Sequence, residues 1–389
     1  MRNVKVFFVG IGGYGATNLD TVMSGYEKNC DIVGVCDICP EKSQFYQQLL
    51  DMGVPIYKTM EEFFAEHTAE LTVISTPIHM HAAQSCYAME HGSNVLCEKP
   101  VASTVAEALE MKRVSEKTGK FVNIGYQASF HPGNLKFKEM VSSGRLGKLI
   151  SASTVVLWPR TEAYYGRSPW AGKLTDGSGK LVLDSVTNNA TAHYLHNMFY
   201  VLGGGANRSL VPENIEFELY RGNAIESFDT CALRVHCTTG ETLHYFASHT
   251  VDKNIGPLTR FEFENGVAEI DPETKTLVLT EKDGTVTDFG DIFSDARTKL
   301  IHSAAMVRGD AEAVCCVEAA LSHTKVVEAF HRDPAYIKDV ACAVKEYDNS
   351  ILHYVEGMDE VLLRCSRQLA LPGELGCPWS GGVIREQIQ

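Results

Sequence analysis

From Val4 to about Tyr126 the sequence alternates short apolar runs with longer amphipathic stretches, and this alternation restricts the possible folds more than any other feature. The apolar runs read VKVFFVG, DIVGVCD, LTVIS, NVLCE and FVNIGY. Between them lie helix-like stretches such as PEKSQFYQQLLDMG and TVAEALEMKRVSEKTG, which end in glycine as helix C-termini often do. Strands that alternate with helices predict a doubly wound parallel sheet with helices on both faces.

The pattern changes after Gly147, where longer strand-like runs rich in Thr, Val, Phe and Tyr begin. Turn signals such as TTGE, ENG and KDGT separate some of these runs, which indicates a large, mostly antiparallel sheet. Because 389 residues exceed one ordinary core, we predict an α/β domain over residues 1–126 and an α+β domain over residues 127–389. The tail beyond about residue 348 shows no assignable pattern.

The amino-acid composition argues against some classes of partner and of cellular location. With 35 Lys and Arg against 49 Asp and Glu, the net charge of −14 argues against nucleic acids and membrane surfaces as partners. No apolar stretch approaches the ~20 residues that span a bilayer, and the N-terminus lacks the pattern of a secretory signal. Several of the 12 cysteines sit in apolar runs, which favours a reducing compartment, the cytoplasm. Cys36 and Cys39 form a single CxxC, for which we favour a structural role over a redox or metal role.

A glycine motif follows the first apolar run. Gly10, Gly12 and Gly15 form GxGxxG between a strand and a helix, the context in which this motif binds a dinucleotide pyrophosphate. Asp37 ends the second run, at the spacing of an acid that binds a ribose 2′-hydroxyl. Such a carboxylate would repel a 2′-phosphate, and no Lys or Arg follows until Lys42, so we expect NAD rather than NADP. The alternative is a glycine-rich turn with an incidental acid.

A lysine stands where the fifth apolar run ends. CEKP places Lys99 at the carboxyl edge of the predicted parallel sheet, where open α/β folds bind their ligands. An ammonium group there can stabilise an alkoxide that develops on a hydroxyl as hydride leaves its carbon. Glu98 could hold the lysine as an ion-pair partner. Taken alone, Glu-Lys-Pro before a helix is more often a cap and a turn.

Several motifs together resemble those of one protein family. The GxGGxG motif, STPIHMHA, HGSNVLCEKPVA, NIGYQASFHP and SSGRLGKLISAS resemble the Gfo/Idh/MocA family of glucose–fructose oxidoreductases, inositol dehydrogenases and rhizopine catabolism proteins, in register over about residues 4–155. The resemblance implies a Rossmann domain, then a domain whose open sheet builds homodimers or homotetramers, and NAD(P)-linked oxidation or reduction of sugars or polyols. It also implies a cis peptide bond between Lys99 and Pro100.

The resemblance also assigns roles to single residues. It places Lys99 beside the nicotinamide and the substrate hydroxyl, and Tyr126 and Gln127 in the substrate pocket. Ser129 stands where many members carry arginine, which argues against an anionic substrate clamped at that position. With the glycine motif and Asp37, the expected cofactor contacts are Gly10, Gly12, Gly13, Tyr14, Gly15, Asp37, Thr76, Pro77, His81, Glu98 and Lys99. For His81, which opens a helix, a structural role is an equal alternative.

The second catalytic element of the family departs from its pattern here. Where the family carries Asp-x-Gly-x-His-x-x-Asp, counting back from Gly203 gives Asn189, Thr191, His193 and His196, so that only the histidine matches. His193 can still act as the general base. Asn189, four residues earlier and on the same face of a predicted helix, could bind the substrate or His193.

Two alternatives concern the neighbours of His193. Asp184 could supply the missing carboxylate only if the helix starts after it and the chain folds back, so it is a weaker candidate. His193 and His196 could instead bind a metal, but no third ligand accompanies them, and we predict no metal site. A buried structural histidine is the better interpretation of His196.

The loop YYGRSPWAG precedes this element. Aromatic faces pack on sugar rings, so Trp170, and more weakly Tyr165 and Arg167, could form a lid over a carbohydrate. A surface loop anchored by Trp170 is an equal alternative.

The sequence thus predicts an NAD-dependent oxidoreductase that acts on a sugar, cyclitol or glycoside hydroxyl, with Lys99 and His193 as catalytic residues. The first rival is a redox-neutral, NAD-dependent enzyme that cleaves glycosides by oxidation and elimination. The second is a non-catalytic, dinucleotide-binding regulator, against which the retention of Glu98, Lys99 and His193 argues.

Overall fold

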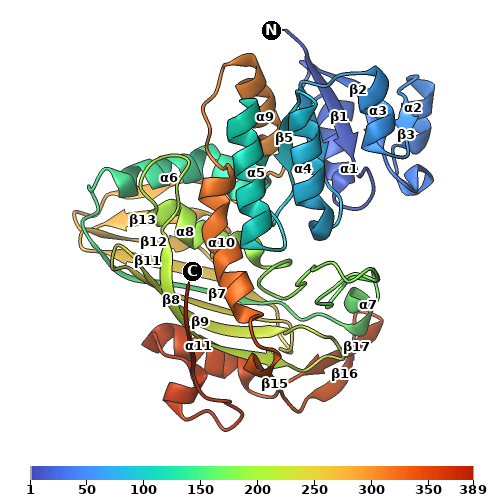
Figure 1. Cartoon of the computed structure of the whole chain (residues 1–389). Coiled ribbons are helices and arrows are strands. Elements are labelled where there is room, and N and C mark those ends of the chain that lie inside the picture. Colours follow the sequence, from blue (N-terminus) through green and yellow to red (C-terminus); the bar gives the residue numbers. More distant parts are fainter. Residues whose placement is uncertain (1, 389) are drawn as a thin grey trace. The chain divides into compact units, whose positions relative to one another are not determined.

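The computed structural model of the chain describes residues 2–388, which form two compact units (Figure 1). The first unit comprises Met1–His131, Ala206–Arg208 and Phe293–Leu321. The second comprises Pro132–Gly205, Ser209–Ile292 and Ser322–Gln389. We describe each unit by itself.

The first unit is built on a six-stranded sheet with the order β3-β2-β1-β4-β5-β6, in which every neighbouring pair is parallel. Its strands are β1 Val4–Val9, β2 Cys30–Cys36, β3 Ile56–Tyr57, β4 Leu71–Ile74, β5 Asn94–Cys97 and β6 Val122–Ile124. This is the strand order of dinucleotide-binding Rossmann folds. The predicted doubly wound parallel sheet is confirmed.

Helices cover this sheet on both faces (Figure 1). They are α1 Gly15–Met23, α2 Tyr46–Asp51, α3 Met60–Glu66, α4 His81–Glu90, α5 Val105–Thr118 and α9 Thr298–Arg308, with the short 3-10 helices η1 Pro40–Lys42, η2 Ile78–Met80 and η3 Gln127–Phe130. Because side chains alternate along a strand, Phe7 and Phe8 of β1 face opposite ways. Phe8 packs in a core cluster with Leu19 of α1, while Phe7 stacks on Phe63 of α3 with ring centroids 3.8 Å apart.

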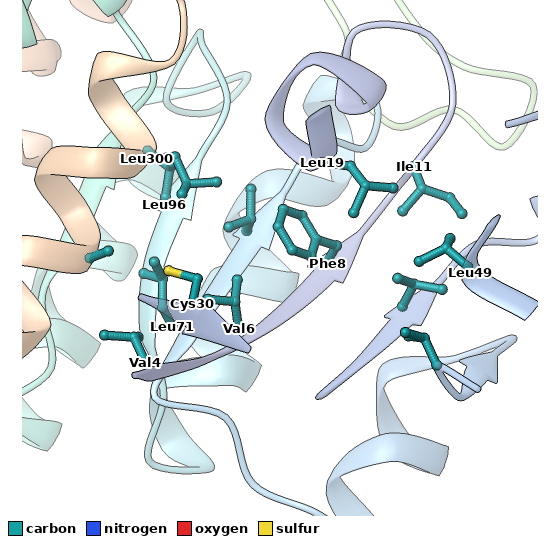
Figure 2. Close-up of a cluster of buried hydrophobic side chains, with 14 residues drawn as sticks. Val4, Val6, Phe8, Ile11, Leu19, Cys30, Leu49, Leu71, Leu96 and Leu300 are labelled. Atoms are coloured by element: carbon teal, nitrogen blue, oxygen red, sulfur yellow. The ribbon is translucent and has the colours of Figure 1, made fainter. Parts of the chain in front are cut away.

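A segment from far along the sequence completes this core. Leu300 and Ala304 of α9 belong to the same buried cluster as Leu96 of β5, and Figure 2 shows Leu300 beside Leu96. The first compact unit is therefore not confined to the predicted residues 1–126, because α9 contributes part of its apolar core. No local pattern reveals that a helix some 200 residues further along the chain belongs to this sheet.

The second unit is built on a ten-stranded sheet with the order β14-β13-β12-β11-β7-β10-β9-β8-β15, to which β18 is added on β8. Its strands are β7 Leu149–Leu157, β8 Pro212–Arg221, β9 Thr230–Cys237, β10 Thr242–Ser248, β11 Ile255–Phe263, β12 Gly266–Ile270, β13 Leu277–Glu281, β14 Val286–Asp288, β15 Ile337–Asp339 and β18 Ile384–Gln387. Only the pairs β7–β10 and β8–β15 are parallel. The prediction of a large, mostly antiparallel sheet is confirmed.

The helices of the second unit include α6 Pro132–Ser142, α7 Glu162–Tyr165, α8 Ala192–Leu202 and α11 Met358–Gln368, with η4 Pro334–Tyr336 and η5 Pro372–Leu375. The helix α10 Val317–Phe330 begins in the first unit and ends in the second. The unassigned tail contains the hairpin β16 Ala343–Tyr347 and β17 Ser350–Tyr354, followed by α11 and β18. Met358 and Leu362 of α11 pack with Val155 and Phe246 of the sheet, so the tail covers part of one sheet face.

None of the helices in residues 2–388 is long and apolar enough to cross a membrane. Over the same residues, no three His, Cys, Asp or Glu side chains are grouped so that they could hold a metal ion. Cys36 and Cys39 are both free thiols, and burial raises the pKa of Cys36 to about 12.

Candidate dinucleotide and substrate sites

The glycine loop has the shape that a bound pyrophosphate requires. Gly10 has φ +80°, and a Cβ added to Gly15 would lie 2.2 Å from the carbonyl oxygen of Gly10, so neither position accepts a side chain without rearrangement. A Cβ on Gly12 or Gly13 would meet nothing within 4 Å. Backbone atoms therefore fill the side of the loop at Gly10 and Gly15. The side at Gly12 and Gly13, just before the N-terminus of α1, is free of protein atoms. Its residues fit a dinucleotide phosphate.

Asp37 follows β2 and is fixed against this loop. Its carboxylate accepts hydrogen bonds from the backbone N–H of Ile11 and of Cys39, both at 2.9 Å. These bonds join the glycine loop to the carboxyl end of β2, where a ribose hydroxyl would bind. The acid therefore occupies the position that the spacing in the sequence predicts.

Glu98, at the end of β5, has a different ion-pair partner from the expected one. We expected it to pair with Lys99, but its Oε1 atom pairs with Nζ of Lys299 from α9 and accepts a hydrogen bond at 2.8 Å from Nδ2 of Asn18. Lys299 is completely buried. Burial alone would lower the pKa of Lys299, but the adjacent Glu98 carboxylate holds this pKa above its usual value. Glu98 thus lies in a buried charge pair beneath the loop.

The expected cis peptide bond between Lys99 and Pro100 is confirmed. The backbone N–H of Lys99 donates to Oε2 of Glu98 at 3.3 Å. On the other side of the loop, the ring nitrogens of His81 lie 2.8 Å from the carbonyl oxygen of Pro100 and 2.9 Å from that of Thr76. His81 is buried, and this burial lowers its pKa. These contacts favour the structural interpretation of His81, which joins the end of β4 to the Lys99 loop.

Tyr14 and Gln127 are joined by a hydrogen bond, and the ring of Tyr14 lies beside Lys299. The hydroxyl of Tyr14 donates to Oε1 of Gln127 at 2.9 Å, and Nε2 of Gln127 donates to the carbonyl of Phe293. Nζ of Lys299 lies 4.7 Å from the centroid of the Tyr14 ring, which itself is 46% exposed. Tyr126, in contrast, is 0% exposed. The structure therefore supports a packing role for Tyr126 rather than the expected substrate contact.

In the second unit, the helix that carries His193 begins later than we predicted. α8 starts at Ala192, with His193 in its first turn, so Asn189 lies before the helix and not on a shared helical face. The residues before it are held in turns: the Ser185 hydroxyl accepts from the N–H of Asn188, and the Asn188 side chain donates to the carbonyl of Leu183 at 3.0 Å. Such local side-chain bonds compete with helix formation and delay its start.

Because α8 starts after Asp184, the chain between them can turn, and the Asp184 carboxylate reaches the residues just before α8. Its Oδ1 atom accepts from Nδ2 of Asn189 at 2.8 Å, and its Oδ2 atom accepts from the backbone N–H of Gly172 at 2.6 Å. Nη2 of Arg167 lies 3.9 Å from Oδ2. Asp184, buried and close to Asn189, is therefore a better site candidate than its distance in sequence suggests.

The predicted lid loop is packed around Arg167. Its guanidinium lies 3.8 Å from the ring centroid of Tyr164 and 5.1 Å from that of Trp170, and its Nη1 atom donates to the Tyr164 carbonyl at 2.6 Å. The hydroxyl of Tyr165 is buried, and burial raises its pKa well above the usual value. The three predicted lid residues thus belong to one cluster in the second unit.

His196 is buried against the ring of Tyr200, with centroids 5.7 Å apart. Burial, and then His323, hold the pKa of His196 well below its ordinary value. These surroundings support the structural interpretation of His196.

Comparison with known proteins agrees with this geometry. Residues 4–126 match the family GFO_IDH_MocA, described as "Oxidoreductase family, NAD-binding Rossmann fold". Residues 4–126 are thus identified as an NAD-binding Rossmann domain of this family, which confirms the resemblance seen in the motifs.

Named relatives match this chain over part of their length. A 2,7-anhydro-N-acetylneuraminate hydratase of Mediterraneibacter gnavus is 31% identical over 150 residues, which are 39% of this chain and 38% of that protein. An inositol 2-dehydrogenase of Salmonella typhimurium is 26% identical over 170 residues, 42% of this chain and 50% of that protein. The chain thus spans half or less of these two curated relatives.

Solved structures match over more of the chain. The WlbA dehydrogenase of Bordetella pertussis, in complex with NADH and UDP-GlcNAcA, has a TM-score of 0.68 at 18% identity and covers 91% of this chain and 99% of its own. An oxidoreductase of Agrobacterium radiobacter, in complex with NAD+, L-tartaric acid and magnesium, has a TM-score of 0.69 at 16% identity, with 86% and 96% covered. At these identities the likeness shows a shared fold.

The site residues expected from the sequence divide between the two units. The first unit holds the glycine loop, Asp37 and Lys99, together with Thr76 and Pro77 just after β4. The second holds Asp184, Asn189 and His193 with the lid loop. Sequence reasoning missed Lys299, although one signal was present: the lysine lies on the same helical face as Ser303 and next to Leu300, on the buried side of α9.

Proposed function

We propose that this chain is an NAD-dependent oxidoreductase that transfers hydride between a hydroxyl-bearing carbon of a sugar, cyclitol or glycoside and the nicotinamide ring. The observation that carries the proposal is the position of Lys99, two residues after the carboxyl end of β5, in a domain that matches the NAD-binding Gfo/Idh/MocA family. The inositol 2-dehydrogenase relative supports the substrate class.

Each catalytic residue has a defined role in this proposal. Bound NAD supplies the hydride acceptor. The Lys99 ammonium stabilises negative charge on the substrate oxygen, as a preorganised cation does best where water is excluded. His193 accepts the hydroxyl proton, since a neutral imidazole is a competent base near pH 7. Asp184 and Asn189, which are bonded to each other at 2.8 Å, bind the substrate beside His193.

Asp37 supports NAD over NADP. Its carboxylate is held by two backbone N–H groups at the end of β2, and a 2′-phosphate placed there would meet a fixed negative charge. We therefore expect the ratio of kcat/KM for NAD to that for NADP to fall when Asp37 is changed to Ala. Steady-state kinetics with both cofactors measure this ratio.

The decisive test of the function is Lys99→Ala. The purified protein is mixed with NAD and a panel of free sugars, inositols and glycosides, and NADH is followed by its absorbance. We expect turnover to fall by about 10²-fold or more while NAD affinity stays nearly unchanged, because the ammonium acts on the substrate oxygen. Lys117→Ala, at an exposed position of α5, is the matched control. Full activity in Lys99→Ala would remove the mechanism.

A second candidate is a redox-neutral enzyme that oxidises its substrate transiently. The observation that favours it is the hydratase among the relatives. In this case NAD is reduced to NADH and reoxidised within one turnover, so product forms without net production of NADH. Product analysis by chromatography, run beside the absorbance assay, separates the two candidates.

We also propose that the chain assembles as a homodimer or homotetramer. α11 covers part of one face of the large sheet, so an interface on that face would have to include α11 or lie beside it. Light scattering coupled to gel filtration measures the mass, and a monomer at micromolar concentration would overturn this part of the proposal.

A further inference from the structure

Arg160, just after β7 in the second unit, is a cation with aromatic neighbours and no carboxylate partner. Its guanidinium carbon lies 5.0 Å from the ring centroid of Tyr164 and 5.6 Å from that of Trp158. Nη1 donates to the carbonyl of the adjacent Pro159 at 3.3 Å, while Nε is buried and makes no hydrogen bond. Across residues 2–388, no carboxylate oxygen forms an ion pair with Arg160.

A second guanidinium shares the same ring. Arg167 lies 3.8 Å from the ring centroid of Tyr164, so this ring has two cations as neighbours. The nearby carboxylate of Asp184 is 3.9 Å from Arg167 and is already bound by Asn189 and by the N–H of Gly172. It can balance one of the two positive charges, not both.

The other titratable groups of this region leave the second charge unbalanced. Nδ1 of His249 lies 2.8 Å from the carbonyl oxygen of Trp158, and burial, followed by Arg160, lowers its pKa to about 3, so the ring is neutral at pH 7. The carboxylate of Asp229 is bound by Asn223 and by the N–H of Gly222. Neither group pairs with Arg160.

Two ring contacts connect Arg160 to the helix that carries the proposed base. The ring of Trp158 packs edge-on against Tyr194 of α8, with centroids 5.5 Å apart, and Tyr194 directly follows His193 in the first turn of that helix. The aromatic rings and the two guanidinium groups thus belong to the same compact unit as His193, and they form a candidate binding surface for a more distant part of a ligand. Arginine binds planar carboxylates through two parallel N–H donors, and aromatic faces suit the apolar face of a sugar ring.

We propose that Arg160, together with Arg167, binds the carboxylate of an acidic sugar, and that a sugar acid of the uronate class is the substrate class of this site. The inference rests on the proposed function only for the hydroxyl that reacts. The binding of the acid itself is independent of hydride transfer. The role of the predicted lid loop is then to hold two guanidinium groups beside the ring of Tyr164.

The test measures binding rather than turnover. The full-length protein is saturated with NAD and titrated by calorimetry with matched pairs that differ only at C6: D-glucuronate against D-glucose, and D-galacturonate against D-galactose. We expect at least one acid to bind about tenfold or more tightly than its neutral partner, because the carboxylate gains charge-assisted hydrogen bonds from the guanidinium group. Arg160→Gln should abolish this preference, and Arg160→Lys should keep part of it.

Two further variants complete the design. Arg167→Gln should weaken the acid preference in the same direction, and it keeps the proposal falsifiable if Arg160→Gln fails to fold. Arg145→Gln is the control, because this arginine is already paired with Glu281 at 2.7 Å and should leave all affinities unchanged.

Each outcome decides the matter. The inference is overturned if acids and neutral sugars bind equally, or if no member of the panel binds. It is also overturned if the acid preference survives in Arg160→Gln. If neutral sugars are oxidised as fast as the acids, the proposed function stands and the inference fails. If an acid binds through Arg160 but yields neither NADH nor product, the inference stands and the proposed function fails.

Discussion

Lys299 in the first unit and Arg160 in the second share a tyrosine neighbour, but they differ in burial and in their ion-pair partner. Both cations lie beside a tyrosine ring, Lys299 at 4.7 Å from Tyr14 and Arg160 at 5.0 Å from Tyr164. Lys299 is paired with Glu98, whereas Arg160 has no carboxylate partner in the described chain. The first charge is neutralised within the protein and fixes a loop. The second charge lies on a partly exposed side chain and is not neutralised by a carboxylate of the described residues, so the two cations differ in what they can do.

The largest expected effect comes from breaking the first pair. Lys299→Met leaves the Glu98 carboxylate buried without its partner, and we expect a loss of about 3–5 kcal/mol in the free energy of unfolding. Urea denaturation measures this loss. The double variant Lys299→Met with Glu98→Gln removes both charges and should recover most of it. A single variant as stable as the parent protein would show that Glu98 finds another partner, and the comparison would fail.

Replacing Arg160 by Met should have a much smaller effect on stability. Because no buried carboxylate is left behind, we expect the free energy of unfolding to change by about 1 kcal/mol or less, from altered packing against Tyr164 and Trp158. The same urea experiment serves as the measurement. A loss as large as that of Lys299→Met would mean that Arg160 has a structural partner, and would remove the distinction between the two cations.

The smallest effect is a shift in the titration of His249. The pKa of this buried ring is about 3, through burial first and Arg160 second, so Arg160→Gln should move it upward. NMR of the imidazole resonances measures this shift. Because the folded-state pKa lies below the unfolded value of about 6.5, this group's contribution to stability is complete above pH 6.5 and is lost as the pH falls toward 3. The free energy of unfolding of Arg160→Gln should thus fall less steeply than that of the parent protein as the pH is lowered from 6.5 toward 3.

Local patterns in the sequence predicted the parts of the site that depend on neighbouring residues. The glycine loop follows from a short motif, and Asp37 ends β2 as its spacing in the sequence predicts, while the cis bond at Pro100 was implied by the family resemblance. The shape of the glycine loop depends on backbone geometry within a few residues. Such geometry is set by local sterics and can be read from a motif.

Other contacts could not be predicted, because they join distant residues or oppose a local trend. Glu98 and Lys299 are 201 positions apart, and only packing of α9 on the sheet brings them together. Asn189 looked helical by spacing, yet side-chain bonds of Ser185 and Asn188 hold turns before α8. Pattern reasoning assigns periodicity, but it does not detect when a serine or asparagine satisfies the backbone in another way.

The contribution of α9 to the first sheet also bears on the order in which the protein is made. A ribosome delivers the six strands of this sheet within the first 124 residues, but Leu300, Ala304 and the lysine that neutralises Glu98 emerge only after most of the second unit. Domains commonly fold as their residues appear, the N-terminal one first. Here the nascent first unit carries an incomplete apolar face and an unneutralised acid while residues 132–292 are made, so the core of this unit is completed late in synthesis.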